Sequence, residues 1–560
     1  MGEEVPATAD DLTPTGAAEL RPEDSTSAFV RNTAVMAVGT SLSRLTGFLR
    51  IAAMAFAIGI TETRLADSYN IANTTPNIIY ELALGGILSS VLVPVLVEWM
   101  QTRGRAAAWE VAQRLFTVVF ISLTAIAVVG ILIAPWIIRL YTIRVPGADE
   151  EAIRELATFF LRWFMPQIVF YGVGAVGSAL LNADRRFAAP MFAPILNNLI
   201  AIATFLVFAA MPGPAAGSHE LATGAQRLVL ALGTTFGVLG MTIALWPALR
   251  STGFRFAWRP HLRDEAVARI VRLAGWVVVY VAANQVGYLV VLVLAVAKKG
   301  DYAAYGVAFI LFQLPHAIFT VSIVTALLPA MSSRWTDGDV AGVRALVARG
   351  IRATGIIVIP AALGYIVIGR DIVRLLLEHG ATEAKSGALV AEVLALFSLG
   401  LFFFSAFQLL LRAFYAMQDT RTPALINIGA LAVNVGANLL FVLVFDLGVR
   451  GLALGHAASY VFSSTVALLI LRRRLGGFGG EGIGSSLART LVAAGGTALA
   501  AWGTARLIGG WLGTQSLVAL ALQVSGAIVV GLLVFLAAAL ILRIQEVDTV
   551  KRQILARWGR

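Results

Sequence analysis

The sequence predicts an all-α integral membrane protein with 14 transmembrane helices. Of its 560 residues, 58% are hydrophobic and only 13% are charged, and the mean hydropathy is +0.82. A typical soluble domain has about 25% charged residues, so this chain has too few to cover a soluble surface. Its apolar runs are long enough to cross a bilayer, which takes about 20 helical residues. The expected spans are residues 30–59, 68–99, 113–138, 156–182, 187–211, 227–249, 267–297, 303–331, 350–369, 387–415, 422–445, 448–471, 488–509 and 517–543.

The basic residues predict the orientation of these spans. An even number of spans places both termini on one side of the membrane. The segments on that side carry about twice as many lysines and arginines as the opposite loops. Because cytoplasmic loops are enriched in these residues, both termini are expected in the cytoplasm. The acidic loop "GADEEAIRE" (147–155) falls on the opposite side, in agreement.

The connections between the spans suggest the domain organisation. Residues 1–28 are rich in acidic residues, Thr and Pro, which is typical of a disordered, solvated tail. They lack the basic start and apolar core of a secretory signal, so the tail is expected to stay attached. The expected units that follow are the N-lobe 29–249 (spans one to six), the cytoplasmic interfacial linker 250–266, the C-lobe 267–471 (spans seven to twelve), the cytoplasmic loop 472–487, the last two spans 488–543 and the basic segment 544–560. The apolar spacing in 544–560 predicts an amphipathic interfacial helix, with a solvated tail as the alternative.

An internal repeat supports two like lobes of six helices. Span two contains Pro76 and closes at Pro94, and span eight contains Pro315 and closes at Pro329. Spans four and five are joined by "NADRRFAAP" (182–190), and spans ten and eleven by "AMQDTRTP" (416–423). Each is a short hairpin with Asp, then Arg, then Pro at the start of the next helix. Because these features hold equivalent positions in each half, we expect two lobes related by an axis along the membrane normal.

Composition also excludes several classes of function. The chain has no cysteine, which excludes disulfides, thiolate metal sites and cysteine nucleophiles. Its net charge of +11 lies in short clusters between apolar runs, as in membrane loops, so nucleic acid is not an expected partner. The acidic cluster Asp149, Glu150 and Glu151 has no accompanying motif for metal-assisted or acid–base chemistry. We therefore expect a transporter and not a membrane enzyme.

Two arginines lie inside the first span, in "SLSRLTGFLR" (41–50). An arginine at the bilayer centre costs about 2.5–3.5 kcal/mol on insertion scales. Arg44 and Arg50 are separated by about 9 Å of rise and about 120° around an ideal helix. Either they snorkel to the cytoplasmic interface, or they face a polar cavity. Guanidinium groups bind phosphate oxygens bidentately. If the two arginines face a cavity, they therefore indicate an anionic substrate.

Several segments together resemble the MurJ/MviN lipid II flippases of the MOP transporter superfamily. They follow the expected order from span one to span eleven, and the resemblance covers about residues 30–540. The matching segments are "SRLTGFLR" (43–50), "ADSYNIANTTPNII" (66–79), "SSVLVPVL" (89–96), "LLNADRRFAAPMFAPILNN" (180–198), "QLPHAIFTVSIVTALLPAMS" (313–332) and "RAFYAMQDTRTP" (412–423).

The resemblance implies a MOP/MATE-like fold, with two six-helix lobes around a central cavity and two C-terminal helices that form a groove for a lipid tail. It implies that the chain moves the undecaprenyl-pyrophosphate-linked peptidoglycan precursor, lipid II, from the cytoplasmic to the outer leaflet of the bacterial cytoplasmic membrane by alternating access. It also implies membrane lipids and the cell-wall synthesis or division machinery as partners. Two alternatives stay open: another MOP exporter, of a lipid-linked oligosaccharide or a cationic drug, and a non-transporting membrane scaffold.

The resemblance assigns roles to polar residues near the expected cavity. Arg44 and Arg50 match the two arginines of the family's first helix and are the expected pyrophosphate ligands. Asp67 matches an acidic residue at the outer mouth, with a solvated loop acid as the alternative. Asn77 follows Pro76, where a loosened helix frees a carbonyl group. Glu81 is a lone carboxylate deep in span two, and we hypothesise that it pairs with Arg44 or Arg50 and releases it to substrate.

The sequence also departs from the family pattern. Positions where the family has two further cavity arginines hold Tyr80 and Ile310, and positions with two cavity acids hold Gly85 and Phe309. Because two arginines and two acids are absent together, the local net charge is unchanged. Arg162 in span four is either a partial replacement in the cavity or an interfacial arginine, the reading we favour.

No resident cofactor is expected, but the family includes members with a sodium site built from spans seven, eleven and twelve. Here the candidate ligands are Asn284, Asn434 and Asn438, which lack the carboxylate that such a cation prefers. Amide bonding between helices is the favoured alternative. His316 and His456 carry protons near neutrality or make interhelical hydrogen bonds, and we favour the second reading. Coupling to Na⁺, to H⁺ or to the membrane potential stays open.

The two hairpins are the remaining candidate elements, at the cytoplasmic end. Their charged residues are Asp184, Arg185, Arg186, Arg412, Asp419 and Arg421.

Overall fold

The computed structural model describes residues 39, 42–81, 92–145, 147–184, 186–213, 222–259, 285–514, 516–544 and 546. Over these ranges the chain is helical and contains no strand. The expectation of an all-α membrane protein is therefore confirmed. Ten helical segments within the described ranges are long and apolar enough to cross a membrane. An eleventh results if the helices Ala384–Ser398 and Leu401–Ala416, bent by 48°, form one span. The count of 14 stays a prediction.

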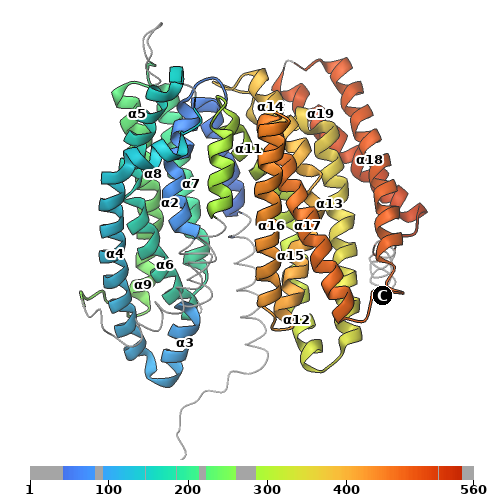
Figure 1. The fold of residues 1–560 in the computed structure, drawn as a ribbon, viewed down its shortest axis with the longest axis horizontal. Coiled ribbons are helices and arrows are strands. Elements are labelled where there is room, and N and C mark those ends of the chain that lie inside the picture. The colour runs from blue at the N-terminus through green and yellow to red at the C-terminus, as the bar shows by residue number, and fades with distance from the viewer. Residues whose placement is uncertain are drawn as a thin grey trace, which may run out of the picture.

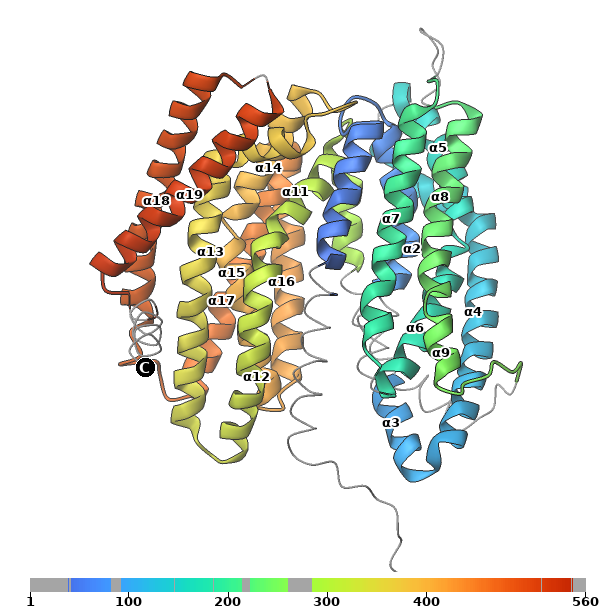
Figure 2. The same ribbon diagram turned by 180° about the vertical axis from the view of Figure 1, so that it is seen from behind.

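The helices form two groups that stand side by side (Figure 1). We call the first the N-lobe; it contains residues 42–58, α2 (Leu65–Glu81), α3 (Val93–Thr102), α4 (Gly104–Tyr141), α5 (Gly147–Phe164), α6 (Gln167–Ala183), α7 (Ala188–Ala210), α8 (Gly224–Ile243) and α9 (Trp246–Ser251). We call the second the C-lobe; it contains Gln285–Ala295, α11 (Asp301–Pro315), η2 (His316–Thr320), α12 (Val321–Thr336), α13 (Val340–Leu377), α14 (Ala384–Ser398), α15 (Leu401–Ala416), α16 (Arg421–Leu439), η3 (Leu440–Val444) and α17 (Gly448–Arg474). The last two helices, α18 (Ile483–Leu512) and α19 (Leu517–Ile541), form a terminal pair outside the C-lobe (Figure 2).

Equivalent helices pack together in the two lobes. In the N-lobe α4 packs on α6, α6 on α8 and α7 on α8. In the C-lobe α13 packs on α15, α15 on α17 and α16 on α17. These pairs are the third, fourth, fifth and sixth spans of each expected half, so the same packing scheme occurs twice.

The two ends of the molecule differ in how the lobes are joined. We call the end at which α2 and α11 begin the gate end, and the end at which α6 and α15 finish the hairpin end. At the gate end a single apolar core contains residues of both lobes, among them Ile58, Ile71 and Phe160 of the N-lobe and Leu292 and Phe397 of the C-lobe. Toward the hairpin end each lobe has its own core, one around Leu180 and one around Phe414. Burial of apolar surface therefore joins the lobes mainly at the gate end.

The terminal pair packs mainly on α13. Small residues allow this close approach, since Ala494 and Ala501 of α18 are buried in separate clusters with side chains of α13. Arg352 of α13 adds polar contacts near the hairpin end, where it donates to the carboxylate of Glu546 and to the Glu481 carbonyl. The terminal pair is thus tied to the C-lobe by both apolar and charged contacts.

Candidate functional site

A cavity of about 220 Å³ lies between the lobes, next to the shared core. Its polar wall comes from one face of α2, where Asn70, Asn73 and Asn77 follow one another at helical spacing. Tyr288, Tyr302 and Tyr305 of the C-lobe lie across the cavity from these asparagines. The remaining residues that line the cavity are Arg50, Ile51, Met54, Tyr69, Phe205, Ala303, Gly306, Val307, Phe309 and Ile310. The Asn73 side-chain oxygen is buried without a hydrogen-bond partner in the described chain. The cavity therefore offers amide, phenol and guanidinium groups to a polar guest.

Arg50 is the charged residue in the described cavity lining. It lies on the helix of residues 42–58, and its side chain is partly exposed. Among the described residues neither Arg50 nor Arg44 has a hydrogen-bond or ion-pair partner. Arg44 is exposed and lies about 9 Å nearer the hairpin end. The two arginines thus follow one path from the hairpin end to the cavity, with Arg50 at the cavity itself.

The departures from the family pattern have direct structural consequences. Phe309 and Ile310 line the cavity with apolar groups, and Phe309 stacks near Tyr305 and Phe397. The two positions at which the family has an acid and an arginine are thus apolar here, one aromatic and one aliphatic. The side chains of Tyr80 and Glu81, and residue Gly85, lie outside the described part of the structure. The pairing of Glu81 with an arginine therefore stays a prediction.

The gate end is closed by a carboxylate that bonds across the lobes. Asp67 of α2 is fully buried and accepts hydrogen bonds from the backbone N–H groups of Gly300 (2.7 Å) and Ala303 (3.4 Å). These groups belong to the first turn of α11, so an N-lobe acid caps a C-lobe helix. Arg64 lies 3.3 Å from Asp67 and also donates to the carbonyl of Val296. Asp67 therefore holds the lobes together, beyond the position at the mouth that its resemblance implied.

A second acid, Glu62, makes the same kind of contact with α14. Its carboxylate accepts from the Glu383 N–H at 2.7 Å and from the Ser386 hydroxyl at 2.5 Å. Glu383 is the N-cap residue of α14. Two N-lobe carboxylates thus cap two C-lobe helices, and we call Glu62 and Asp67 the gate acids.

Glycine allows the lobes to approach this closely. Gly300 has a φ of +78°, and a Cβ at this position would overlap Thr61 of the N-lobe. Gly380, with a φ of +65°, would overlap Phe56 in the same way. Next to it, Ala381 donates to the Phe56 carbonyl at 2.9 Å.

Gly300→Ala is expected to weaken closure at the gate end. The added methyl group meets the Thr61 backbone and forces a left-handed conformation that costs an alanine about 1–2 kcal/mol. The apparent melting temperature should fall, and the exchange of amide hydrogens at the start of α11 should accelerate. Gly364→Ala is the matched control, because a Cβ there meets nothing within 4 Å and favours its helix. Equal behaviour of the two variants would contradict this role of Gly300.

The Glu62 carboxyl predicts how closure depends on pH. Burial raises its pKa, but hydrogen bonds from Ser386, Glu383 and Ile60 outweigh this effect and lower the pKa below its usual value of 4.5. Because the pKa is lowered, ionised Glu62 stabilises the closed gate at pH values above the usual pKa. This stabilisation is lost as the pH falls through the lowered pKa. Hydrogen exchange at the start of α14, after correction for intrinsic rates, should therefore rise as the pH falls below 4.5. In Glu62→Gln the additional rise should be absent; its persistence would assign the effect to another group.

One of the candidate cation ligands lies at a second cavity, of about 220 Å³, within the C-lobe. Asn434 lines it, and Asn438 donates to the Asn434 side chain at 3.0 Å. Asn284 lies outside the described residues. His456 also lines this cavity, between the rings of Phe309, Phe397 and Tyr460. The two asparagines are thus bonded to each other, while the role of this cavity in ion coupling stays a prediction.

Arg162 and His316 lie away from the cavity lining. Arg162 lines a groove between α4 and α5, with Arg139 and Trp163 as neighbours, and is exposed. Of the two readings given for Arg162, the place in the cavity is therefore wrong, because its side chain lines this separate groove. His316 follows Pro315 at the start of η2, and its Nδ1 lies 3.1 Å from the Ser405 hydroxyl.

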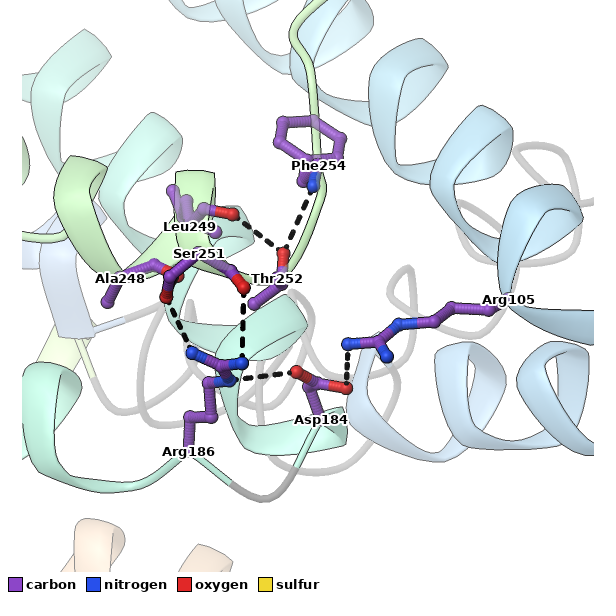
Figure 3. Close-up of polar contacts among 8 residues, drawn as sticks. All are labelled: Arg105, Asp184, Arg186, Ala248, Leu249, Ser251, Thr252 and Phe254. Carbon is purple, nitrogen blue, oxygen red and sulfur yellow. Dashed lines mark hydrogen bonds and ion pairs between the residues drawn. The ribbon is translucent and has the colours of Figure 1, made fainter.

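The residues of the first hairpin bond to other segments of the N-lobe (Figure 3). Asp184 accepts from Arg105 at 2.6 Å and from Arg186 at 3.1 Å. Arg186 also donates to the hydroxyl of Ser251, at the end of span six. Arg185 lies outside the described residues.

The C-lobe hairpin makes a matching contact at the end of span twelve. Asp419 pairs with Arg474 and caps the N–H of Thr422 at 2.9 Å. Burial raises the pKa of Asp419, but hydrogen bonds from Thr422 and the charge of Arg474 outweigh it and lower the pKa to about 2. Arg412 is exposed beside the ring of Tyr415, and Arg421 is exposed at the start of α16. These hairpin contacts stabilise the lobes and lie outside the cavity lining.

Sequence reasoning missed Glu62, Asn70 and Asn73. The two asparagines had a signal, because Asn70, Asn73 and Asn77 repeat with helical spacing inside an apolar span. Glu62 had none, since an acid in a short polar loop is usually solvated, and its partners lie more than 300 residues away.

Comparison with known proteins identifies the family. The sequence model of the family "Lipid II flippase MurJ" matches residues 54–523. A probable lipid II flippase MurJ of Rhizobium meliloti is 29% identical over 413 residues, which cover 73% of this chain and 75% of the relative. The lipid II flippase MurJ of Burkholderia cenocepacia is 29% identical over 441 residues, covering 78% and 82%.

Solved structures show the same fold. A lipid II flippase MurJ in an inward closed conformation matches with a TM-score of 0.73 and 18% identity, covering 91% of this chain and 99% of that one. An inward-facing multidrug resistance transporter of the MATE family matches with a TM-score of 0.63 and 14% identity, covering 80% and 98%. The MOP-like fold predicted from the sequence is thus confirmed, and the family model covers most of the chain. This protein belongs to the MurJ family of lipid II flippases.

Proposed function

We propose that this chain moves lipid II across the cytoplasmic membrane by alternating access, and that Arg50 binds the pyrophosphate. The family is one of transporters, which agrees with the expectation that the chain is not an enzyme. The observation that carries the proposal is the guanidinium of Arg50, which lines an interlobe cavity and has no acidic partner among the described residues. In such a partly enclosed site, attraction to a dense anion is stronger than in bulk solvent.

The arrangement of the gate suggests the direction of entry. We place the hairpin end in the cytoplasm, because the basic residues favour that side. The lobes share a core and the gate-acid contacts at the opposite end. The head group of lipid II would therefore enter from the cytoplasmic side, pass Arg44 and reach Arg50.

Release on the outer side requires the gate acids to leave their helices. Asp67 would withdraw from the start of α11 and Glu62 from the start of α14, so that the lobes separate where they are now joined. New contacts at the hairpin end must replace the lost ones, because the shared core is exposed in that state. The membrane potential, negative inside, favours outward movement of an anionic head group and is the energy source that we propose.

The lining disfavours a cationic drug as the substrate. The described lining has an arginine and no carboxylate, the reverse of what a buried cation requires. An anionic lipid-linked saccharide fits this chemistry, and the family identity favours lipid II among such lipids.

The proposal is tested with the purified chain in vesicles that contain lipid II. A membrane-impermeable reagent that labels the glycan is added outside the vesicles. We expect the accessible fraction of lipid II to rise beyond half on a time scale set by the protein, and faster when a membrane potential is imposed. Vesicles that contain the Arg44→Ala/Arg50→Ala chain are the control. A wild-type rate equal to that of empty vesicles would overturn the proposal and favour a scaffold.

A further inference from the structure

A groove of about 810 Å³ runs between α4 and α5, outside the lobe interface. One wall is a continuous face of α5, and Pro135 and Arg139 of α4 form the other. The α5 residues are Gly147, Glu150, Glu151, Arg154, Glu155, Thr158, Phe159, Arg162 and Trp163. None of the residues that line the central cavity belongs to it.

The packing of α4 against α5 gives the depth of Arg162. At the gate end, Arg154 donates to the hydroxyl of Thr142, so these two residues are level. Further down, a Cβ on Gly130 would overlap Met165, so these residues are level as well. Arg162 is eight residues beyond Arg154, which corresponds to a rise of about 12 Å. Its backbone is therefore well inside the membrane-spanning part of the molecule.

Two of the three glutamates that line the groove are paired with arginines. Glu150 pairs with Arg154, and Glu155 pairs with Arg227 at 2.8 Å. Glu151 lies eleven residues before Arg162, a rise of about 16 Å. In the described part of the chain, Arg139 and Arg162 have no hydrogen-bond, ion-pair or ring partner. The groove thus holds three arginines and three glutamates, and Arg139 and Arg162 are the two arginines in it that pair with no described glutamate.

The groove opens toward the bilayer. Leu132, Trp136 and Leu140 follow one another at four-residue spacing on α4 and are 66%, 63% and 51% exposed. Such a row of exposed apolar side chains beside the groove faces lipid tails in a membrane protein. Trp163, which is 40% exposed, adds an aromatic surface next to Arg162.

We propose that this groove binds the phosphate head group of a phospholipid from the leaflet at the gate end. Arg139 and Arg162 donate to the phosphate oxygens, and an acyl chain lies along Trp136 and Leu132. The charge is complementary, because an unpaired arginine at this depth is costly unless an anion accompanies it. A phospholipid fits better than the transported lipid, since the groove opens sideways to the bilayer and is separate from the central cavity. The proposal does not depend on the transported substrate.

Native mass spectrometry of the full chain with added lipids tests this site. We expect one equivalent of phosphatidylglycerol to be retained by the wild-type chain, and its affinity to fall roughly ten-fold or more in Arg139→Gln/Arg162→Gln. Arg144→Gln is the matched control, an exposed arginine at the same end that does not line the groove. Its affinity should equal that of the wild type.

The remaining outcomes decide between ligands. Diacylglycerol, which lacks a phosphate, should not compete with phosphatidylglycerol; competition would show that the groove recognises only tails and would overturn the proposal. Competition by undecaprenyl pyrophosphate that disappears in the double variant would reassign the groove to the transported lipid. Unchanged retention of phosphatidylglycerol in the double variant would also overturn it. Size-exclusion chromatography shows whether the variant is folded, and a variant that retains lipid II transport but loses the phospholipid separates this site from the proposed function.

Discussion

Arg50→Ala is expected to weaken the binding of undecaprenyl pyrophosphate by roughly 10- to 100-fold. Hydrogen bonds to charged groups contribute about 1.5–3 kcal/mol, and Arg50 is the charged group of the described cavity lining. Arg50→Lys should lose less, because a lysine keeps the charge but not the bidentate geometry. Arg44→Ala should also lose less, since Arg44 is exposed on the path to the cavity and does not line it. The affinities are measured by ligand-induced quenching of tryptophan fluorescence or by calorimetry in detergent.

The control for this series is Arg473→Ala, which removes an exposed arginine at the end of α17. It changes the net charge by the same amount as Arg50→Ala but leaves the cavity intact. If Arg473→Ala and Arg50→Ala weaken binding equally, the effect is a general one of protein charge, and Arg50 is not a ligand.

Asp67→Ala is expected to shift the protein toward a state that is open at the gate end. The substitution removes both backbone contacts to the first turn of α11 and takes the carboxylate partner from buried Arg64. A loss of about 1.5–3 kcal/mol from the closed state would raise the open population roughly 10- to 100-fold. Because the chain has no cysteine, spin labels can be placed at Arg144→Cys and Lys385→Cys, one in each lobe. The distance distribution between the labels should gain a longer component.

Two variants calibrate this measurement. Asp67→Asn keeps one oxygen acceptor for Gly300, so its shift should be smaller than that of Asp67→Ala. Asp446→Ala removes an acid that is 86% exposed and paired with Lys298 at the same end, and it should leave the distances unchanged. A distance distribution for Asp67→Ala identical to that of the wild type would rule out Asp67 as a gate contact.

The spans were the most predictable part of the fold, because a bilayer demands long apolar runs. Even so, span three was expected at 113–138, whereas α4 extends from Gly104 to Tyr141. Helical hydrogen bonding continues into the polar interface, where hydropathy gives no boundary signal. The bend between α14 and α15 was also missed, since no proline marks it. It falls next to Gly400, where a Cβ would overlap Ala457.

The candidate site was predictable only where a residue is costly in its context. Arg50 stands out because a charge in an apolar run demands a partner. The same argument pointed to Arg162, yet that residue lines the groove between α4 and α5, and the sequence does not reveal which side of a helix faces the other lobe. Glu62 was invisible because its function as a cap depends on helices that begin far along the chain.

The central claim is that the cavity at Arg50 carries lipid II to the outer leaflet. It is tested most directly in intact cells whose own flippase is depleted, by measuring the fraction of lipid II that an external impermeable probe modifies. With the wild-type chain as the only copy, this fraction should be restored, and with Arg44→Ala/Arg50→Ala at equal abundance in the membrane it should stay at the depleted level. Restoration of outward lipid II by the double variant would contradict the claim.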